Sequence, residues 1–458
     1  MTIEAMLARY DGRMPRYTSY PTAPHFSAAV GPADYESWLA DLPRDAALSL
    51  YVHVPFCDRL CLYCGCNTAV VRQESARRAY AETLMLEIAM VAARLGRRAR
   101  VTAVHWGGGT PTTLPGDVLI AVMDEIRLYF EVPATAEIAI ELDPTAFTPE
   151  ICGALRHMGV TRASLGVQDF DPAVQAAIGR AQSLAQTLDC AAQLRRIGVA
   201  GLNLDLIYGL PNQTVASVAR TAVQALTLQP DRLAVFGYAH VPWIKRHQAL
   251  LDAYPLPGPG ERFAQAREIA GILARDGFRP IGLDHYARPA DTMAQAAARG
   301  ALHRNFQGYT TDAAGALLGF GASAIGRLGG GYVQNAPAAR SYMAGLRAGR
   351  LATAKGIATS PEDRLRGAVI ERLMCDLKVD LAALAAAHGA AVSALRPPAS
   401  RLQPFAADGL LRCEADTILV TEAGRPFLRN IAALFDRYLA APETERSPQA
   451  APRYAAAV

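Results

Sequence analysis

Four of the chain's eight cysteines lie within ten residues, in the segment CDRLCLYCGC (57–66). Cys57, Cys61 and Cys64 have the spacing C-x3-C-x2-C. Structural zinc usually requires a second pair of ligands beyond a longer loop, and a thioredoxin-like pair would leave the third cysteine unexplained. Three thiolates from one tight loop can hold three corners of a cubic [4Fe–4S] cluster and leave the fourth iron open. We therefore predict an iron–sulfur site with these three cysteines as the metal ligands.

The composition indicates a soluble protein without a nucleic-acid or membrane partner. The 46 basic and 42 acidic residues give a net charge of +4, and no basic run suggests binding to nucleic acid. No stretch of about 18 consecutive apolar residues is present, and the N-terminus lacks the apolar segment of a secretory signal. We expect a cytoplasmic protein whose other cysteines are buried, reduced thiols.

Short apolar, β-branched runs recur along most of the chain. They lie around residues 49–57 and at 101–108, 137–144, 162–169, 201–209, 232–240 and 278–285. Between most of them are amphipathic segments of helical length, which together indicate βαβ units and a parallel sheet. Six or seven such units favour a closed or partly closed (β/α) barrel, and a doubly wound open sheet is the competing arrangement.

Polar residues follow the ends of these predicted strands. In order along the chain they are Cys57, Gly107–Thr110, Glu141 with Asp143, Gln168, Asp205 and His240. The carboxyl ends of all the strands of a barrel open on one face, where active sites lie. One or two of these residues could be turn formers or helix caps, but six successive strand ends favour a shared site.

The rest of the chain lies outside the strand–helix alternation of residues 47–290. Residues 1–46 are expected to form an irregular N-terminal arm that contributes to the substrate site, and residues 291–358 a connecting segment that completes the active site. Residues 359–440 have helical periodicity and predict a small helical C-terminal domain, with a hairpin near residues 410–421. Residues 441–458 are expected to be a disordered tail.

Longer motifs around the cysteines resemble one family. The cysteine triad after a first barrel strand, with Tyr63 before its last member, is similar to the signature of radical S-adenosylmethionine (SAM) enzymes. The motifs YVHVPFCDRLCLYCGCN, HWGGGTPT, LGVQDF, NLDLIYGLP, FGYAH, LHRNFQGYTT and RYTSYPT resemble the oxygen-independent coproporphyrinogen III oxidases, over about residues 14–440. The resemblance implies a partial (β/α) barrel of the radical SAM type, with an N-terminal arm and a small, mainly helical C-terminal domain.

The resemblance also implies an activity. It is the anaerobic oxidative decarboxylation of two propionate side chains of coproporphyrinogen III to vinyl groups, which gives protoporphyrinogen IX in haem biosynthesis. A [4Fe–4S] cluster cleaves SAM to methionine and a 5′-deoxyadenosyl radical, and two SAM molecules are used per turnover. The expected partners are this substrate, a low-potential electron donor and an electron acceptor, and the protein is expected to be a monomer.

The same resemblance assigns roles to residues at the strand ends. The glycines let the backbone approach SAM closely, the carboxylates suit its ammonium or ribose groups, and an arginine can bind a carboxylate with two hydrogen bonds. The implied SAM contacts are Tyr51, Tyr63, Gly108, Gly109, Thr110, Glu141, Gln168, Arg180, Asp205, Ala239 and Ile325. The implied catalytic residues are Cys66, Tyr51 and Gln307.

Cys66 cannot be a fourth cluster ligand if SAM needs the open iron. Related haem chaperones usually have an aromatic residue there, whereas the oxidases have cysteine, so Cys66 is expected near the substrate or a second SAM. A small buried residue is the alternative interpretation. A macrocycle with four carboxylates also needs aromatic walls and basic or amide rims, which residues 16–22 and 303–311, Arg429 and Asn430 are expected to supply.

Two positions depart from the family pattern. Thr145-Ala146 follows ELDP where relatives have Arg-Glu, and Gly237 stands where a side-chain amide is common. The main alternative function is haem binding or haem trafficking without oxidase activity. A small electron carrier is a second alternative, but a 458-residue barrel with an open iron fits it poorly.

Overall fold

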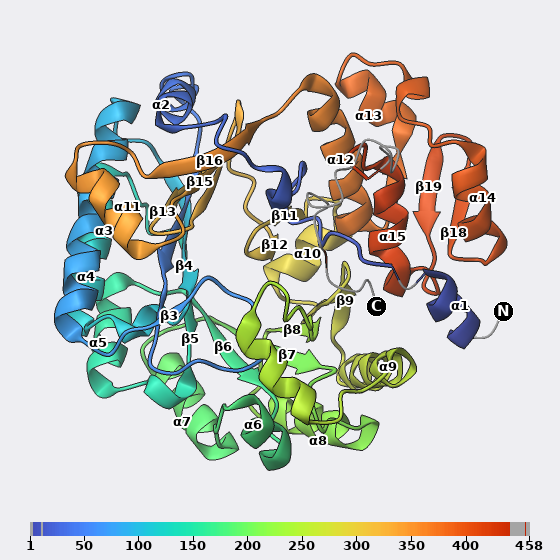
Figure 1. The fold of residues 1–458 in the computed structure, drawn as a ribbon, viewed down its shortest axis with the longest axis horizontal. Coiled ribbons are helices and arrows are strands. Elements are labelled where there is room, and N and C mark those ends of the chain that lie inside the picture. The colour runs from blue at the N-terminus through green and yellow to red at the C-terminus, as the bar shows by residue number, and fades with distance from the viewer. Residues whose placement is uncertain (1–2, 11, 440–453, 455–458) are drawn as a thin grey trace.

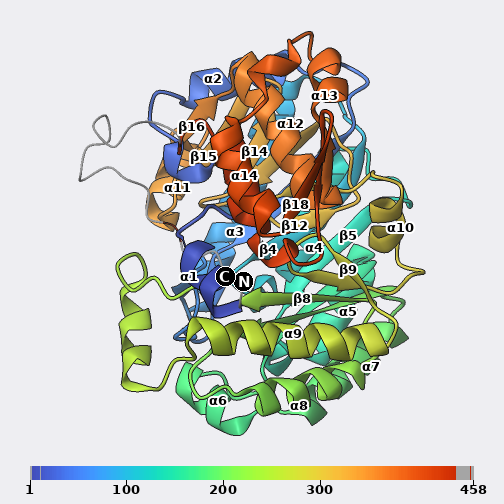
Figure 2. The same ribbon diagram turned by 90° about the vertical axis from the view of Figure 1, so that its right-hand side faces the viewer.

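The computed structural model describes residues 3–10, 12–439 and 454. Figure 1 shows a curved sheet with helices along its outer side, and a separate group of helices from α12 (Pro361–Asp376) onward beside it. Turned by 90°, Figure 2 shows α8 (Val215–Leu226) and α9 (Pro259–Arg275) running along the outside of the sheet. Among the described residues, no helix is long and apolar enough to cross a membrane.

Six parallel strands form the centre of the sheet in the order of the chain. They are β1 (Leu48–Val54), β4 (Val101–Gly108), β5 (Glu137–Leu142), β6 (Arg162–Gln168), β7 (Gly201–Tyr208) and β8 (Arg232–Gly237). The connecting helices are α3 (Glu74–Leu95), α4 (Gly116–Tyr129), α5 (Pro149–Met158), α6 (Pro172–Ile178), α7 (Leu184–Arg196) and α8. Since the strand order never reverses, the doubly wound arrangement is wrong and the partial (β/α) barrel is confirmed.

The seventh predicted strand, at residues 278–285, is wrong as a single parallel strand. The segment forms β9 (Arg279–Ile281) and the start of β10 (His285–Ala287), which pair with each other in antiparallel fashion. Gly282 between them has φ +54°, a left-handed conformation that turns the chain back. β10 also pairs antiparallel with β8, so the sheet ends there without closing.

The other edge of the sheet is extended by the segment predicted as a connection. Within residues 291–358, β13 (Ala316–Phe320) pairs parallel with β1. β14 (Ile325–Leu328), β15 (Gly331–Asn335) and β16 (Thr353–Ala358) then add antiparallel strands. The segment is therefore part of the twelve-stranded main sheet as well as a connection.

The N-terminal arm is less irregular than predicted. It contains α1 (Ile3–Tyr10) and α2 (Pro32–Ala40). Pro32 opens α2, and the Asp34 carboxylate accepts a hydrogen bond from the Gly31 N–H, which caps the first turn. These capping signals explain why a helix forms in a stretch rich in Pro and Gly.

The C-terminal part has a hydrophobic core of its own. It contains α12, α13 (Leu381–Ala387), α14 (Ala399–Ala407), α15 (Leu428–Ala432) and a sheet of β17 (Lys378–Asp380), β18 (Leu411–Glu414) and β19 (Thr417–Val420). The antiparallel pair β18–β19 confirms the hairpin predicted near residues 410–421. Leu7, Tyr10, Tyr17 and Tyr20 of the arm belong to the same core, so both ends of the chain build it. Apart from Tyr454, the predicted tail lies outside the described residues, and the domain boundaries stay predictions.

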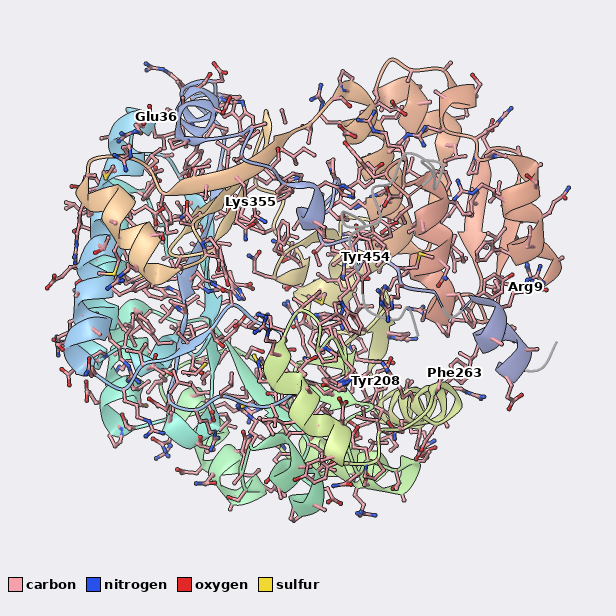
Figure 3. All side chains as sticks on the ribbon, in the orientation of Figure 1. Arg9, Glu36, Tyr208, Phe263, Lys355 and Tyr454 are labelled. Carbon is pink, nitrogen blue, oxygen red and sulfur yellow. The ribbon has the colours of Figure 1, made fainter. Side chains whose placement is uncertain are left out.

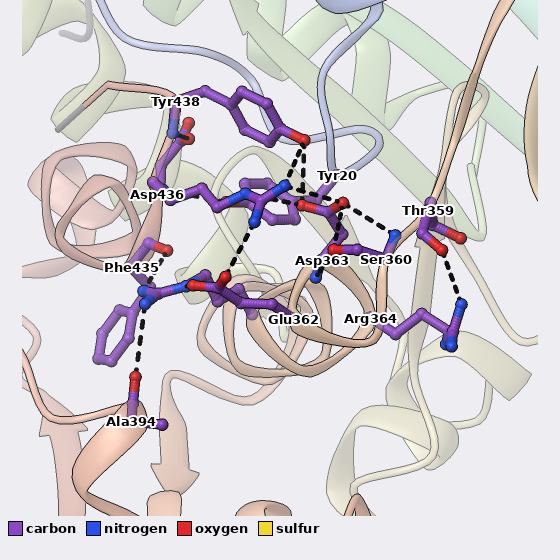
Figure 4. Close-up of polar contacts among 12 residues, drawn as sticks. Tyr20, Thr359, Ser360, Glu362, Asp363, Arg364, Ala394, Phe435, Asp436 and Tyr438 are labelled. Atoms are coloured by element: carbon purple, nitrogen blue, oxygen red, sulfur yellow. Dashed lines mark hydrogen bonds and ion pairs between the residues drawn. The ribbon is translucent and has the colours of Figure 1, made fainter. Parts of the chain in front are cut away.

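Polar contacts fasten the end of the C-terminal part to the start of α12 (Figure 4). Arg437 forms an ion pair with Glu362 (2.9 Å), and the Tyr438 hydroxyl donates to Asp363 (3.1 Å). The Arg437 N–H donates to the Tyr20 hydroxyl at 3.0 Å, which brings the N-terminal arm into the same network.

A buried carboxylate fixes the added strands to the barrel. Glu87 of α3 is buried and accepts hydrogen bonds from the Gly321 N–H (2.7 Å), the Asn335 amide (2.6 Å) and the Tyr342 hydroxyl (2.7 Å). Burial raises the pKa of Glu87 to about 7, although the three hydrogen bonds oppose the shift. Burial also raises the pKa of the nearby Tyr80 and Tyr342 hydroxyls, which stay neutral.

Glu87 makes stability depend on pH. Because its folded pKa lies above its ordinary value of 4.5, the folded state binds the proton more tightly than the unfolded state. Proton binding by Glu87 therefore adds roughly 3 kcal/mol to the free energy of unfolding. This contribution is fully present below about pH 4.5 and is lost as the pH rises through about 7. We expect urea unfolding of Glu87→Gln to show less loss of unfolding free energy between pH 5 and pH 8 than the wild type. The control is Glu82→Gln, an exposed change on the same helix, which should keep the wild-type dependence of unfolding free energy on pH. If Glu87→Gln also kept the wild-type dependence, Glu87 would not be the group that titrates.

Candidate active site

A cavity of about 640 Å³ opens at the carboxyl ends of the parallel strands. Most of the site residues expected from the sequence line it. These are Cys57, Cys61, Tyr63, Cys64, Cys66, Gly108, Gly109, Thr110, Glu141, Gln168, Arg180, Asp205 and Ala239. The barrel therefore gathers in one place side chains that lie up to 182 residues apart in the sequence, between Cys57 and Ala239.

The cysteine loop starts directly after β1. Cys57 ends the short strand β2 (Phe56–Cys57), which pairs with β3 (Ala69–Val70), and the Cys64 N–H donates to the Cys61 carbonyl at 3.1 Å. The three thiols face one cavity. Three thiolates from one loop suit a cluster of several irons, each bound by one thiolate.

The thiols lie in different electrostatic surroundings. The hydrogen bond from the Cys66 side chain lowers the pKa of the Cys64 thiol to about 6, and the Cys66 N–H also donates to Cys64 Sγ (3.4 Å). Burial raises the pKa of the Cys57 thiol to about 11. The Arg180 guanidinium donates to Cys61 Sγ at 3.6 Å.

Glycines at the end of β4 let this strand lie directly against the cysteine loop. An added Cβ would lie 2.6 Å from the His53 ring at Gly108, and 2.5 Å from the Phe56 carbonyl oxygen and 3.0 Å from Cys57 Sγ at Gly109. The Gly109 N–H donates to the Val54 carbonyl at 2.8 Å, which fixes the approach. With no side chain in the way, backbone atoms of the turn face the cavity.

Two half-buried carboxylates line the cavity and have opposite pKa shifts. Glu141 accepts hydrogen bonds from His105 Nε2 and from the Gly108 N–H, each at 3.2 Å. Burial alone would raise the pKa of Glu141, but these donors outweigh it and hold the pKa below its usual value. Asp205 accepts from Ser164 (3.0 Å), and burial raises the pKa of Asp205 to about 6. Glu141 therefore stays ionised to a lower pH than Asp205 and can attract a cation.

A buried arginine lies beside the cysteine loop. Arg180 donates to the Gly166 carbonyl at 2.7 Å and lies 3.2 Å from the Asp143 carboxylate. Burial lowers the pKa of Arg180, but Tyr63 and Asp143 together raise it above its ordinary value. Gln168, beside it, has φ +67° at an irregularity of the β6–β7 pairing, which turns this side chain toward the cavity.

A segment after β8 holds the cysteine loop, and none of its residues was predicted to belong to the site. Lys245 Nζ donates to the Cys66 carbonyl at 2.7 Å, His247 Nε2 to the Cys64 carbonyl at 2.9 Å, and Gln248 Nε2 to the Tyr63 carbonyl at 2.8 Å. We call these three side chains the loop clamp. The only signal in the sequence is the polar run KRHQ after the sixth strand, on the face where the active site is expected.

Three residues expected at the site do not line this cavity. The Tyr51 hydroxyl bonds to His53 Nδ1 (3.0 Å), and Ile325 begins β14 at the far edge of β13. Gln307 lies in the turn between β11 (His303–Asn305) and β12 (Gly308–Thr310). It lines a deeper cavity of about 200 Å³, which shares Glu141 and Asp205 with the main one. Contacts of these three residues with SAM or substrate stay predictions.

Only some of the residues expected to contact the substrate line the main cavity. Arg16 and Arg429 line the main cavity. The Tyr17 hydroxyl donates to Asp436 (3.0 Å), the Tyr20 hydroxyl accepts from Arg437, and the Asn430 amide donates to the Tyr10 carbonyl (2.8 Å). Those three side chains therefore join the arm to the C-terminal part and do not point into the cavity.

Arg59 contacts the turn at Thr145, one of the positions that depart from the family pattern. Arg59, on the cysteine loop, donates to the Thr145 hydroxyl at 3.0 Å and to the Asp143 carboxylate at 3.4 Å. A guanidinium therefore reaches the turn where the resemblance led us to expect an arginine, but from a different strand end.

Comparison with known proteins gives one consistent result. The radical SAM superfamily profile matches residues 51–225, and the HemN C-terminal domain profile matches residues 359–427. The oxygen-independent coproporphyrinogen III oxidase of Bradyrhizobium diazoefficiens is 50% identical over 94% of this chain and 95% of that protein. The Escherichia coli enzyme of the same name is 40% identical over 95% of each chain. The solved structure of coproporphyrinogen III oxidase (HemN) from Escherichia coli, described as a radical SAM enzyme, superposes with a TM-score of 0.89 at 39% identity and covers 95% of this chain and 98% of its own.

The loop clamp predicts how firmly the cysteine loop holds iron. Gln248→Leu keeps the side-chain size but leaves the buried Tyr63 carbonyl and Val241 N–H without their partner. We expect iron to leave the reconstituted protein several-fold faster in the presence of a chelator, measured by loss of visible absorbance under anaerobic conditions. The control is Gln193→Leu, whose amide bonds only to Asp189 on a helix surface and which should lose iron at the wild-type rate. An equal rate in the Gln248→Leu protein would show that the clamp does not support the loop.

Proposed function

This chain belongs to the oxygen-independent coproporphyrinogen III oxidases of the radical SAM superfamily, and we propose that it converts two propionates of coproporphyrinogen III to vinyl groups, giving protoporphyrinogen IX for haem biosynthesis without oxygen. The observation that carries the proposal is a sequence identity of 50% over 94% of the chain. The match therefore includes the N-terminal arm and the C-terminal part as well as the barrel. Haem binding or trafficking without oxidation is not favoured, because the relatives that match over this length are named as oxidases.

The residues of the cavity fit a [4Fe–4S] cluster with SAM. Cys57, Cys61 and Cys64 would each bind one iron, and Arg180 lies close enough to one sulfur to offset part of the negative charge of the thiolates. The glycine turn, which has no room for a Cβ against Cys57, leaves backbone beside the open iron. When bound, the reduced cluster and SAM supply the 5′-deoxyadenosyl radical that removes a hydrogen from the propionate chain.

The chain's own groups would orient SAM by charge and shape. Glu141 is ionised at neutral pH and suits the ammonium group, while the carboxylate of SAM would lie toward Arg180 or Gln168. Asp205 would accept from a ribose hydroxyl, and Tyr63 with Ala239 supplies part of the wall. Because the cavity is partly walled off from bulk water, these charges act more strongly than they would at the surface.

Substrate would enter at the mouth of the cavity. Arg16 and Arg429 would attract carboxylates there, and Cys66, an exposed thiol on the cavity wall, would lie between the cluster site and the substrate. Loss of carbon dioxide from the propionate chain also releases one electron, so turnover needs an electron acceptor as well as a low-potential donor for the cluster. We expect the protein to act as a monomer in the cytoplasm.

Single cysteine changes test the ligand assignment. Cys57→Ser, Cys61→Ser and Cys64→Ser should each abolish the brown absorbance of the cluster together with SAM cleavage, because a hydroxyl does not replace the thiolate on iron. Cys66→Ser should keep iron content and lower conversion of coproporphyrinogen III. Iron per protein, SAM cleavage and product mass are measured anaerobically on the same preparations. A full cluster in any triad variant, or iron loss in Cys66→Ser, would contradict the assignment, and haem binding without conversion by wild-type protein would favour the alternative function.

A further inference from the structure

A second cavity lies beside the active site. It has a volume of about 280 Å³ and is lined by residues of β7, β8, α9 and the C-terminal part, among them Tyr208 and Phe263 (Figure 3). Arg16, Gly237 and Arg429 line both this cavity and the main one. The two spaces therefore adjoin each other at the end of β8.

The second cavity is rich in guanidinium groups. Five arginines line it, from the N-terminal arm, α9 and the C-terminal part: Arg16, Arg262, Arg267, Arg425 and Arg429. Its acidic residues are Asp284 and Glu422, and each already has a partner. Asp284 pairs with His285 at 2.7 Å, and Glu422 pairs with Arg425 at 3.2 Å. The balance of charge in the cavity is therefore positive.

Two of the arginines have charge available for a ligand. Arg16 donates to the Gly237 carbonyl at 3.1 Å and Arg262 to the Tyr238 carbonyl at 3.0 Å. Among the residues that the structure describes, neither forms an ion pair with a carboxylate. The Arg429 guanidinium is buried close by, and burial together with the charge of Arg16 lowers the pKa of Arg429 to about 9. Like charges held this close favour an anion between them.

Gly237 stands on the wall that the two cavities share. An added Cβ there would lie 2.9 Å from the Tyr208 hydroxyl and 3.2 Å from Arg262 Nη2, so only glycine lets these two side chains lie so close to the end of β8. The guanidinium of Arg262 therefore stands on the arginine-cavity side of this shared wall.

We propose that this arginine cavity binds the two propionates of the substrate that do not react. The inference rests on the proposed function, since it takes coproporphyrinogen III as the substrate. A tetrapyrrole whose reacting propionate points at the cysteine loop must place its other carboxylates away from it, and the arginine cavity is the adjoining space with positive charge. Both remaining propionates survive in the product, so they are available to hold the macrocycle during either decarboxylation.

Porphyrins with different numbers of carboxylates test the proposal. Coproporphyrin III carries four propionates, whereas mesoporphyrin IX keeps only the two that do not react. Dissociation constants are measured by fluorescence quenching for the reconstituted protein with SAM, kept anaerobic. We expect Arg262→Gln to weaken binding of both porphyrins by the same factor, about tenfold, because both lose a charged hydrogen bond. Arg16→Gln is the second variant and replaces Arg262→Gln if that protein does not fold. It changes an exposed residue and should weaken binding of both porphyrins by the same factor.

Arg275→Gln is the matched control, because Arg275 is an exposed arginine on the same helix that lines neither cavity. It should bind both porphyrins like the wild type. A loss confined to coproporphyrin III would mean that the arginines hold a reacting propionate, and would overturn the proposal. Unchanged binding in the Arg262 and Arg16 variants, or an equal loss in Arg275→Gln, would overturn it too. Wild-type conversion of coproporphyrinogen III is assayed separately: its absence would refute the proposed function, while conversion with unchanged binding would refute only the arginine cavity.

Discussion

The active site depends on a contact between two pieces of backbone with no side chain between them. The glycine turn that ends β4 lies against the cysteine loop that follows β1, and a single methyl group at Gly109 would meet the Phe56 carbonyl at 2.5 Å. This contact is possible because β1 and β4 are neighbouring parallel strands whose ends reach the same level. The position of the thiols, the open side of the cluster site and the space for SAM all follow from it.

Charged groups are paired around this contact. Arg180 pairs with Asp143 at 3.2 Å, while Glu141 accepts a hydrogen bond from His105 at 3.2 Å. Ion pairs removed from water add little net stability, because the loss of hydration costs about as much as their attraction gains. Their value lies in holding an anion-binding and a cation-binding group at fixed places in one cavity.

The sequence predicts the parts of this arrangement that depend on local spacing. The cysteine triad, the glycine turn and the polar residues at strand ends are all adjacent to strong strand signals. Together with residues that only the family resemblance implied, such as Arg180 and Ala239, thirteen of the predicted site residues line one cavity. Contacts that arise from long-range packing were not predictable. The loop clamp comes from an irregular segment after β8, Ile325 lies on a strand at the far side of β13, and the strand predicted at residues 278–285 turns back at Gly282. Nothing in the local pattern of those segments records which partner they meet.

The shared core of the two chain ends has a consequence for synthesis on the ribosome. Leu7 and Tyr10 share a core with Phe427 and Phe435, so the first helix cannot reach its place until residue 435 has been made. The barrel, whose neighbouring strands are close in sequence, can form while translation continues. Arg16 and Arg429, which both line the main cavity, therefore meet later than the strands that carry the cysteine loop and the glycines of β4.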